Sequence, residues 1–98
     1  MNSKTLTLLG FASKAGKLAF GMDSAKTSLK QGKSRLIVVA ADVSAKSLKE
    51  IKFFAEEKAE VIEISCDKET LSHAVGKKCG IISVNDKGFS ESIIKEHE

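Results

Sequence analysis

The 98-residue sequence contains no proline, no tryptophan and no tyrosine, and its five aromatic residues are all phenylalanines. Proteins that hold single-stranded nucleic acid in a groove stack its bases on aromatic side chains, and the phenylalanines here fall mostly on expected core positions. Any contact with nucleic acid should therefore use charge, backbone groups and shape. No linker is visible either, and we expect a single domain over residues 1–98.

The sequence also lacks long hydrophobic runs and the core of a signal peptide. No apolar run approaches the roughly 18 residues that suggest a transmembrane helix. Residues 2–5 lead into a helical pattern that polar residues interrupt. Hydrophobic residues make up 42% of the chain and charged residues 30%, which excludes a disordered chain. We expect a cytoplasmic protein.

Residues typical of metal sites and of nucleophilic catalysis are scarce. Cys66 and Cys79 are the only cysteines, no pair stands at zinc-finger spacing, and neither has an obvious activating base. His73 lies beside Ser72 with Asp67 near in the chain, but there is no nucleophile elbow. We interpret His73 as a helix-surface residue and predict no metal and no cofactor.

A nucleotide triphosphatase site is also excluded. Gly16 and Gly21 have the spacing of a phosphate-binding loop, but Met22 and Asp23 follow where lysine and serine or threonine are required. Asp42 ends a buried strand, where α/β enzymes often place a catalytic carboxylate. We interpret it as a cap for the helix that follows. The sequence therefore predicts a protein without enzymatic activity.

Negative charge is nearly absent from the first third of the chain. Residues 1–37 hold seven lysine and arginine residues against Asp23 alone, a net charge of +6, so residues 38–98 must total −3 to give the overall +3. This asymmetry indicates a surface that faces a polyanion such as nucleic acid. The alternative is that these lysine and arginine side chains form a solvent-exposed face that binds no partner.

Hydrophobic periodicity predicts five helices that alternate with four strands. The strands are expected at residues 18–20, 36–41, 61–64 and 81–84. The first helix should bury Leu8, Phe11, Ala12 and Ala15, begin at Asn2 or Ser3, and end at Gly16. The later helices should begin at Asp23, Ser44 and Asp67 and, after a turn at 85–88, at Phe89. Because residues 36–41 are continuously apolar, that strand should be buried on both faces, in an α/β sandwich of three layers (α-β-α) around a small mixed sheet.

The start of the second helix is a candidate anion site. Its free N–H groups are expected to point outward after Gly21, beside Lys17, Lys26 and Lys30. Lys26 and Lys30 stand four residues apart on one helical face, where like charges repel. A bound anion would relieve this repulsion, although water and salt would also screen it.

Several stretches together resemble the kink-turn-binding ribosomal proteins, the family of archaeal proteins seven-Ae and thirty-e, and above all its bacterial YlxQ-like members. The stretches are Leu8-Leu-Gly-Phe-Ala12, Lys14-Ala-Gly-Lys-Leu18, Gly21 to Gly32, Leu36-Ile-Val-Val-Ala-Ala-Asp42, Ala74-Val-Gly76 and Asp86-Lys-Gly-Phe89. The resemblance covers nearly the whole chain. It implies the same three-layer sandwich and the binding of sharply bent RNA.

In that family a Gly-x-Asn-Glu-x-x-Lys signature opens the second helix and grips the RNA. The aligned residues here are Gly21, Asp23, Ser24 and Thr27, so the glycine alone matches. The resemblance further implies contacts around a flipped-out base from the start of the third helix and from the loop at 76–80. The charge pattern and the resemblance together predict the RNA-binding residues Lys17, Phe20, Gly21, Met22, Asp23, Ser24, Lys26, Thr27, Lys30, Lys33, Ser44, Leu48, Lys77 and Lys78.

Two functions from different classes follow. The first is a non-catalytic RNA-binding protein of ribosomal type that docks the Gly21 helix start and the 76–80 loop onto structured RNA, such as ribosomal RNA. The alternative is a protein-interaction module of the transcription and translation machinery that kept the fold and lost kink-turn recognition. The departures at Asp23, Ser24 and Thr27 fit the alternative.

Overall fold

The computed structural model describes residues 3–97, so Asn2, one of the two candidate caps of the first helix, lies outside the described residues. The helices are α1 (Ser3–Lys14), α2 (Met22–Lys30), α3 (Ala45–Ala55), α4 (Lys68–Val75) and α5 (Lys87–His97). The strands are β1 (Leu18–Phe20), β2 (Leu36–Val39), β3 (Glu60–Glu63) and β4 (Ile81–Val84). None of the described helices is long and apolar enough to cross a membrane.

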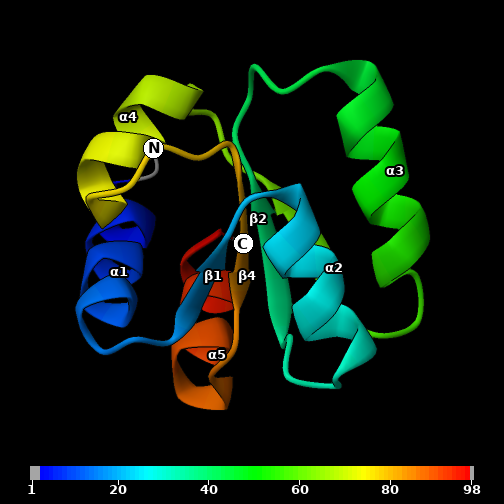
Figure 1. Cartoon of the computed structure of the whole chain (residues 1–98). Helices are drawn as coiled ribbons and strands as arrows, with labels where there is room; N and C mark the ends of the chain where they lie inside the picture. The colour runs from blue at the N-terminus through cyan, green and yellow to red at the C-terminus, as the bar shows by residue number, and fades with distance from the viewer. Residues whose placement is uncertain (1–2, 98) are drawn as a thin grey trace.

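The four strands form one mixed sheet in the order β1-β4-β2-β3. β2 pairs in parallel with β3, and β4 runs antiparallel to both β1 and β2. All four residues of β2 are fully buried, with Ile37 and Val39 packed beneath α2 and α3, and Leu36 and Val38 packed beneath α1, α4 and α5. Helices therefore cover both faces of the sheet, and the predicted three-layer α-β-α sandwich is confirmed (Figure 1).

The buried face of α1 differs from the prediction. Leu9 and Ala12 are fully buried, but Phe11 is 56% exposed and Ala15 is exposed beyond the end of the helix. The reason is the close approach of α4, since a Cβ on Gly10 would lie 3.0 Å from the Ala74 carbonyl oxygen. The helix turns its small residues toward α4 and leaves Phe11 outside.

Two aspartates cap helices in ways that the sequence did not predict. The Asp42 carboxylate accepts the N–H of Lys68 at 2.8 Å, so Asp42 caps α4 and not the helix that follows it in the chain. The Asp86 carboxylate accepts the N–H of Phe89 at 2.8 Å. With this cap α5 begins at Lys87, inside the expected turn.

Three strand boundaries also shift. β2 ends at Val39 because the N–H groups of Ala40 and Ala41 donate to the carbonyls of Gly80 and Cys66, which lie outside the strands. β3 runs from Glu60 to Glu63, one residue earlier than expected at both ends, and Glu60 pairs with the beginning of β2.

The topology sorts the loops into two groups at opposite ends of the sheet (Figure 1). Because β4 is antiparallel to β1 and β2, one end carries the β1–α2, β2–α3 and α4–β4 connections. We call it the Gly21 end. The other end carries the α1–β1, α2–β2 and β4–α5 connections, at the bottom of Figure 1.

Candidate nucleic-acid interface

The first segment of the Gly21 end is the start of α2. Gly21 has φ 92° and ψ 166°, a conformation that side-chain-bearing residues rarely adopt, and its N–H donates to the Ile81 carbonyl at 2.8 Å. No side chain of the described residues caps the helix here. Asp23 and Ser24 are exposed in the first turn. The first-turn N–H groups are therefore open to a ligand, although the Asp23 carboxylate competes with an anion.

The second segment is the start of α3. Ser44 caps the helix as predicted, since its Oγ accepts the Ser47 N–H at 3.1 Å and lies 3.0 Å from the Ser47 hydroxyl. Leu48 is half-buried one turn further on. Ser44 thus has its hydroxyl committed to the cap, while the surface beside it combines hydroxyl and apolar groups.

The third segment is the loop between α4 and β4. Gly76 ends α4 in the left-handed conformation, with φ 76°. The Lys77 ammonium then lies 5.2 Å from the centre of the Phe20 ring, which positions a cation beside the β1–α2 connection. Lys78 is exposed. The loop therefore presents both predicted lysines at the Gly21 end.

Ser72 fixes the end of this loop. Its hydroxyl accepts the Cys79 N–H at 3.0 Å and donates to the Lys68 carbonyl at 2.6 Å. Burial raises the pKa of the Cys79 thiol, which keeps it protonated and unreactive. Cys79 is a structural residue, as predicted for a cysteine without an activating base.

One cavity opens where the three segments meet, and a second one adjoins it. A cavity of about 240 Å³ lies between Gly21, Ser44 and Gly80. A larger one, of about 650 Å³, lies on the far side of Gly80 and is lined by Lys78 and His73 among others. Lys68 borders both. The sequence predicted three of the segments that enclose these cavities but not the cavities themselves.

Lys68 is a residue that sequence reasoning missed. A Cβ on Gly80 would lie 2.8 Å from Cδ of Lys68, so the absence of a side chain at Gly80 makes room for the lysine stem. The signal for Lys68 was its place directly after Asp67, whose carboxylate caps α4 by accepting the Thr70 N–H at 2.8 Å. Because β3 runs parallel to β2, α4 begins at the Gly21 end, and its first residue Lys68 therefore borders the interface.

The predicted contact residues do not all gather at the Gly21 end. Ten lie at or near it, namely Phe20, Gly21, Met22, Asp23, Ser24, Thr27, Ser44, Leu48, Lys77 and Lys78. Lys17, Lys30 and Lys33 lie at the opposite end, because they precede β1, end α2 and precede β2 respectively. They therefore do not flank the helix start as the sequence suggested.

Lys26 has a different partner. Its ammonium pairs with the Glu50 carboxylate on α3 and lies 4.4 Å from the centre of the Phe54 ring. The expected repulsion between Lys26 and Lys30 is thus relieved within the protein, and only 21% of the Lys26 side chain is exposed. Lys26 holds α2 against α3.

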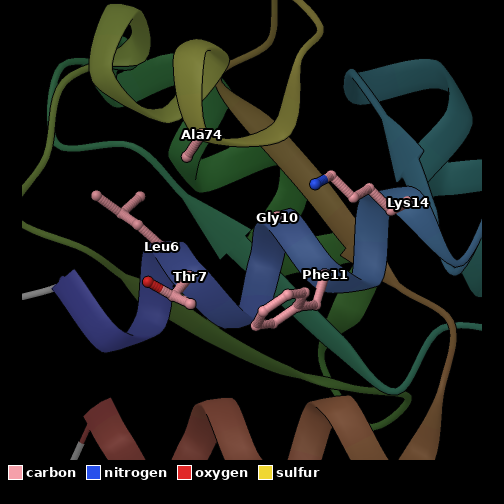
Figure 2. Close-up of a pocket in the computed structure, with 6 residues that line it drawn as sticks. All are labelled: Leu6, Thr7, Gly10, Phe11, Lys14 and Ala74. Atoms are coloured by element: carbon pink, nitrogen blue, oxygen red, sulfur yellow. The ribbon is translucent and has the colours of Figure 1, made fainter.

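A third cavity, of about 340 Å³, lies apart from these segments in the groove between α1 and α4 (Figure 2). It is lined by Leu6, Thr7, Gly10, Phe11, Lys14 and Ala74. The Phe11 ring lies on the outer side of α1, and the Lys14 side chain extends over the groove. This groove contains none of the predicted RNA-binding residues.

The described residues contain no group of three or more histidine, cysteine, aspartate or glutamate side chains that could hold a metal ion. The interface instead combines backbone N–H groups, hydroxyls and ammonium groups with the carboxylates of Asp23, Asp42 and Glu69. The N–H, hydroxyl and ammonium groups can bind anions, and the hydroxyls and carboxylates can bind polar edges.

Taken together, these observations define a three-layer sandwich with loops, helix starts and two cavities gathered at one end of its sheet. The sequence matches the Ribosomal protein L7Ae/L30e/S12e/Gadd45 family over residues 3–94, and the chain belongs to this family. The resemblance read from the sequence is thereby confirmed.

Two relatives agree with this assignment. The large ribosomal subunit protein eL30 of Candida glabrata is 36% identical over 86 residues, which cover 85% of this chain and 82% of the relative. The RNA-binding protein YlxQ of Enterococcus faecium is 26% identical over 92 residues, or 90% and 85% of the two chains.

Among solved structures, a Bacillus halodurans protein of unknown function has a TM-score of 0.92 at 25% identity, with 97% of each chain covered. A Giardia lamblia 15.5kD RNA binding protein has a TM-score of 0.78 at 18% identity, covering 99% of this chain and 87% of that one. This second likeness concerns the fold alone.

Proposed function

We propose that this chain is a non-catalytic RNA-binding protein of ribosomal type that acts in the cytoplasm and grips a bent, kink-turn-like RNA at the Gly21 end. The family and the relatives named eL30 and YlxQ support binding to structured RNA, with ribosomal RNA as the natural candidate. The observation that carries the proposal is the meeting of an uncapped helix start with two further segments around one cavity.

The cavity between Gly21, Ser44 and Gly80 is the proposed place for a nucleotide that leaves the stack. Its volume of about 240 Å³ is near the lower limit of about 300 Å³ for small-molecule sites, which suits a single nucleobase. Lys68 at its border and Lys78 in the adjoining cavity supply charge for the phosphates on either side. Extruded bases are a common target of RNA recognition.

A Ser44→Trp variant tests this placement, because the indole would fill the cavity mouth from the surface of α3. We expect the variant to fold and to lose affinity for bent RNA by about tenfold or more. The matched control is Ser92→Trp on the exposed face of α5, far from the interface. Equal affinities of the two variants would contradict the proposal.

The alternative function, a protein-interaction module of the transcription and translation machinery, is favoured by one observation. Phe11, which is 56% exposed, lines the α1–α4 groove together with Leu6 and Ala74, and contiguous exposed apolar surface of this kind marks protein-interaction sites. The alternative predicts that association with a translation factor or the ribosome persists after nuclease treatment and is lost in Phe11→Ser. Association that disappears with the RNA would exclude it.

A further inference from the structure

Five basic residues gather at the end of the sheet opposite the Gly21 end. They are Lys17, Lys30, Lys33, Arg35 and Lys87, and we call this surface the basic end. Lys17 and Arg35 flank the end of β4, since the Asn85 N–H donates to the Lys17 carbonyl and the Arg35 N–H donates to the Val84 carbonyl, each at 2.8 Å. Two strand spacings, about 10 Å, therefore separate these two backbone positions.

None of these five charges is neutralised within residues 3–97. The ion pairs there are Lys26–Glu50 and Lys52–Glu63, and all five side chains of the basic end are exposed. The Asp86 carboxylate, beside Lys87 in the chain, accepts the Phe89 N–H. Beyond β2, Glu60 and the α3–β3 connection with Glu56 and Glu57 bound the surface on that side. The positive charge is thus left for a partner.

A buried polar network holds the loops of the basic end in place. Asn85 donates through its side-chain amide to the Ser28 hydroxyl at 3.1 Å, which ties the β4–α5 connection to α2. The Ser83 hydroxyl lies 2.8 Å from the Ser34 hydroxyl, which ties β4 to the α2–β2 loop. The backbone that carries the charges is therefore pre-organised, so that binding costs little ordering of the loops.

We propose that the basic end is a second RNA-binding surface, which contacts the phosphate backbone of a double-stranded RNA segment. The protein then bridges two segments of an RNA, because this surface and the Gly21 end lie at opposite ends of the sheet (Figure 1). The inference goes beyond the proposed function, which concerns the Gly21 end alone.

The chemistry of the basic end favours a duplex backbone over a single strand. Lysine and arginine bind phosphate oxygens, whereas single-strand binding also needs aromatic side chains for base stacking. The chain has no tyrosine or tryptophan, and the basic-end residues line none of the three cavities described above. A double-stranded segment, which presents phosphates without exposed bases, matches this surface.

A two-RNA binding assay tests the inference. The protein is bound to an immobilised kink-turn RNA, and a labelled straight RNA duplex is added at low salt. We expect recruitment of the duplex by the wild type, and its loss in Lys33→Gln/Arg35→Gln, which still binds the kink-turn RNA. Each neutralised residue should also lower the slope of log affinity for the duplex against log salt by about one.

Two control variants sharpen the assay. Lys4→Gln/Lys95→Gln removes two charges outside the basic end, from α1 and α5, and should recruit the duplex as the wild type does. Lys78→Ala should lose kink-turn affinity and keep duplex affinity. Equal loss of duplex binding in Lys4→Gln/Lys95→Gln, or a wild type that recruits no duplex, would overturn the inference.

The same assay separates the inference from the proposed function. If the wild type fails to bind the kink-turn RNA, the proposed function is wrong, and direct titration of the duplex then decides the inference alone. Duplex affinity that depends on Lys33 and Arg35 would support the basic end even then. Duplex affinity that is unaffected by these substitutions would refute it.

Discussion

At the scale of single residues, backbone conformation at the end of β1 and at the end of α4 shapes the interface. Gly21 and Gly76 both have positive φ, but they occupy different regions, with ψ 166° and 16° respectively. The conformation of Gly76 is the left-handed one that asparagine tolerates. The conformation of Gly21 is almost confined to glycine.

This difference predicts unequal effects of the same substitution. Gly21→Asn should lower the free energy of unfolding by about 1–3 kcal/mol through backbone strain, because no atom within 4 Å would clash with a Cβ there. Gly76→Asn should cost less. Urea denaturation of both variants measures the difference, and equal costs would argue against the strain.

A second residue-scale prediction concerns two buried serines. Ser83 is fully buried and its hydroxyl lies 2.6 Å from Oδ1 of Asn85, so Ser83→Ala leaves the amide oxygen without this donor. We expect a loss of about 1–3 kcal/mol in unfolding free energy.

Ser90 is the matched control. Its hydroxyl is buried and has no hydrogen-bond partner among the described residues. Ser90→Ala should therefore be neutral or slightly stabilising. Thermal unfolding of the two variants gives the comparison, and a Ser90→Ala variant as destabilised as Ser83→Ala would contradict this account.

The residues of the interface were only partly predictable from the sequence. Gly21, Ser44 and Gly76 carry local signals of helix starts and ends, and each lies where those signals predict. Lys26 carries no such signal, and the only signal for Lys68 is its place directly after the helix cap Asp67. The role of Lys26 depends on Glu50, a residue of another helix, and that of Lys68 depends on the absence of a side chain at Gly80.

At the scale of elements, the alternation of helices and strands was predictable because each has its own apolar period. Which face of a helix is buried was harder to predict. α1 has two possible apolar faces, and the contact between Gly10 and α4 decides which one is buried. Phe11 is exposed for that reason, and the sequence alone could not reveal a contact between residues 64 positions apart.

Helix α4 provides a pH-dependent prediction. The Thr70 N–H donates a hydrogen bond to the Asp67 carboxylate, and this bond lowers the pKa of Asp67 below its usual value of 3.8. A lowered pKa in the folded state means that the stabilisation is present above the unfolded pKa and is lost as the pH falls through the folded one.

The wild type should therefore be more stable than Asp67→Asn at neutral pH, and the difference should shrink as the pH falls below about 4. Urea midpoints between pH 2 and 7 measure it. A constant gap between wild type and Asp67→Asn would refute this role of the carboxylate.

The packing of α2 against α3 predicts that two lysines differ in their effect on RNA binding. Lys26 is paired with Glu50, whereas Lys78 is exposed in the α4–β4 loop. Lys78→Ala should weaken binding and lower the salt slope by about one. Lys26→Ala should leave the slope nearly unchanged, as filter binding at several salt concentrations would show. A larger effect at Lys26 would contradict this division of roles.

At the scale of the whole molecule, the topology separates charges that the sequence groups together. Residues 1–37 carry a net charge of +6, but Lys17 precedes β1 and Gly21 follows it, so the strand puts them at opposite ends of the sheet. Composition therefore predicted the kind of partner, and the fold decides where contacts with it can form.

The central claim is that the Gly21 end recognises bent RNA, although the Asn, Glu and Lys of the family signature are replaced by Asp23, Ser24 and Thr27. The most direct test is a titration of the wild type with a kink-turn RNA and a matched straight duplex at about 150 mM salt, near physiological ionic strength. We predict that the kink-turn RNA binds at least about tenfold more tightly, a difference of ~1.4 kcal/mol. Equal affinity for the two RNAs, or no binding to either, would contradict the account.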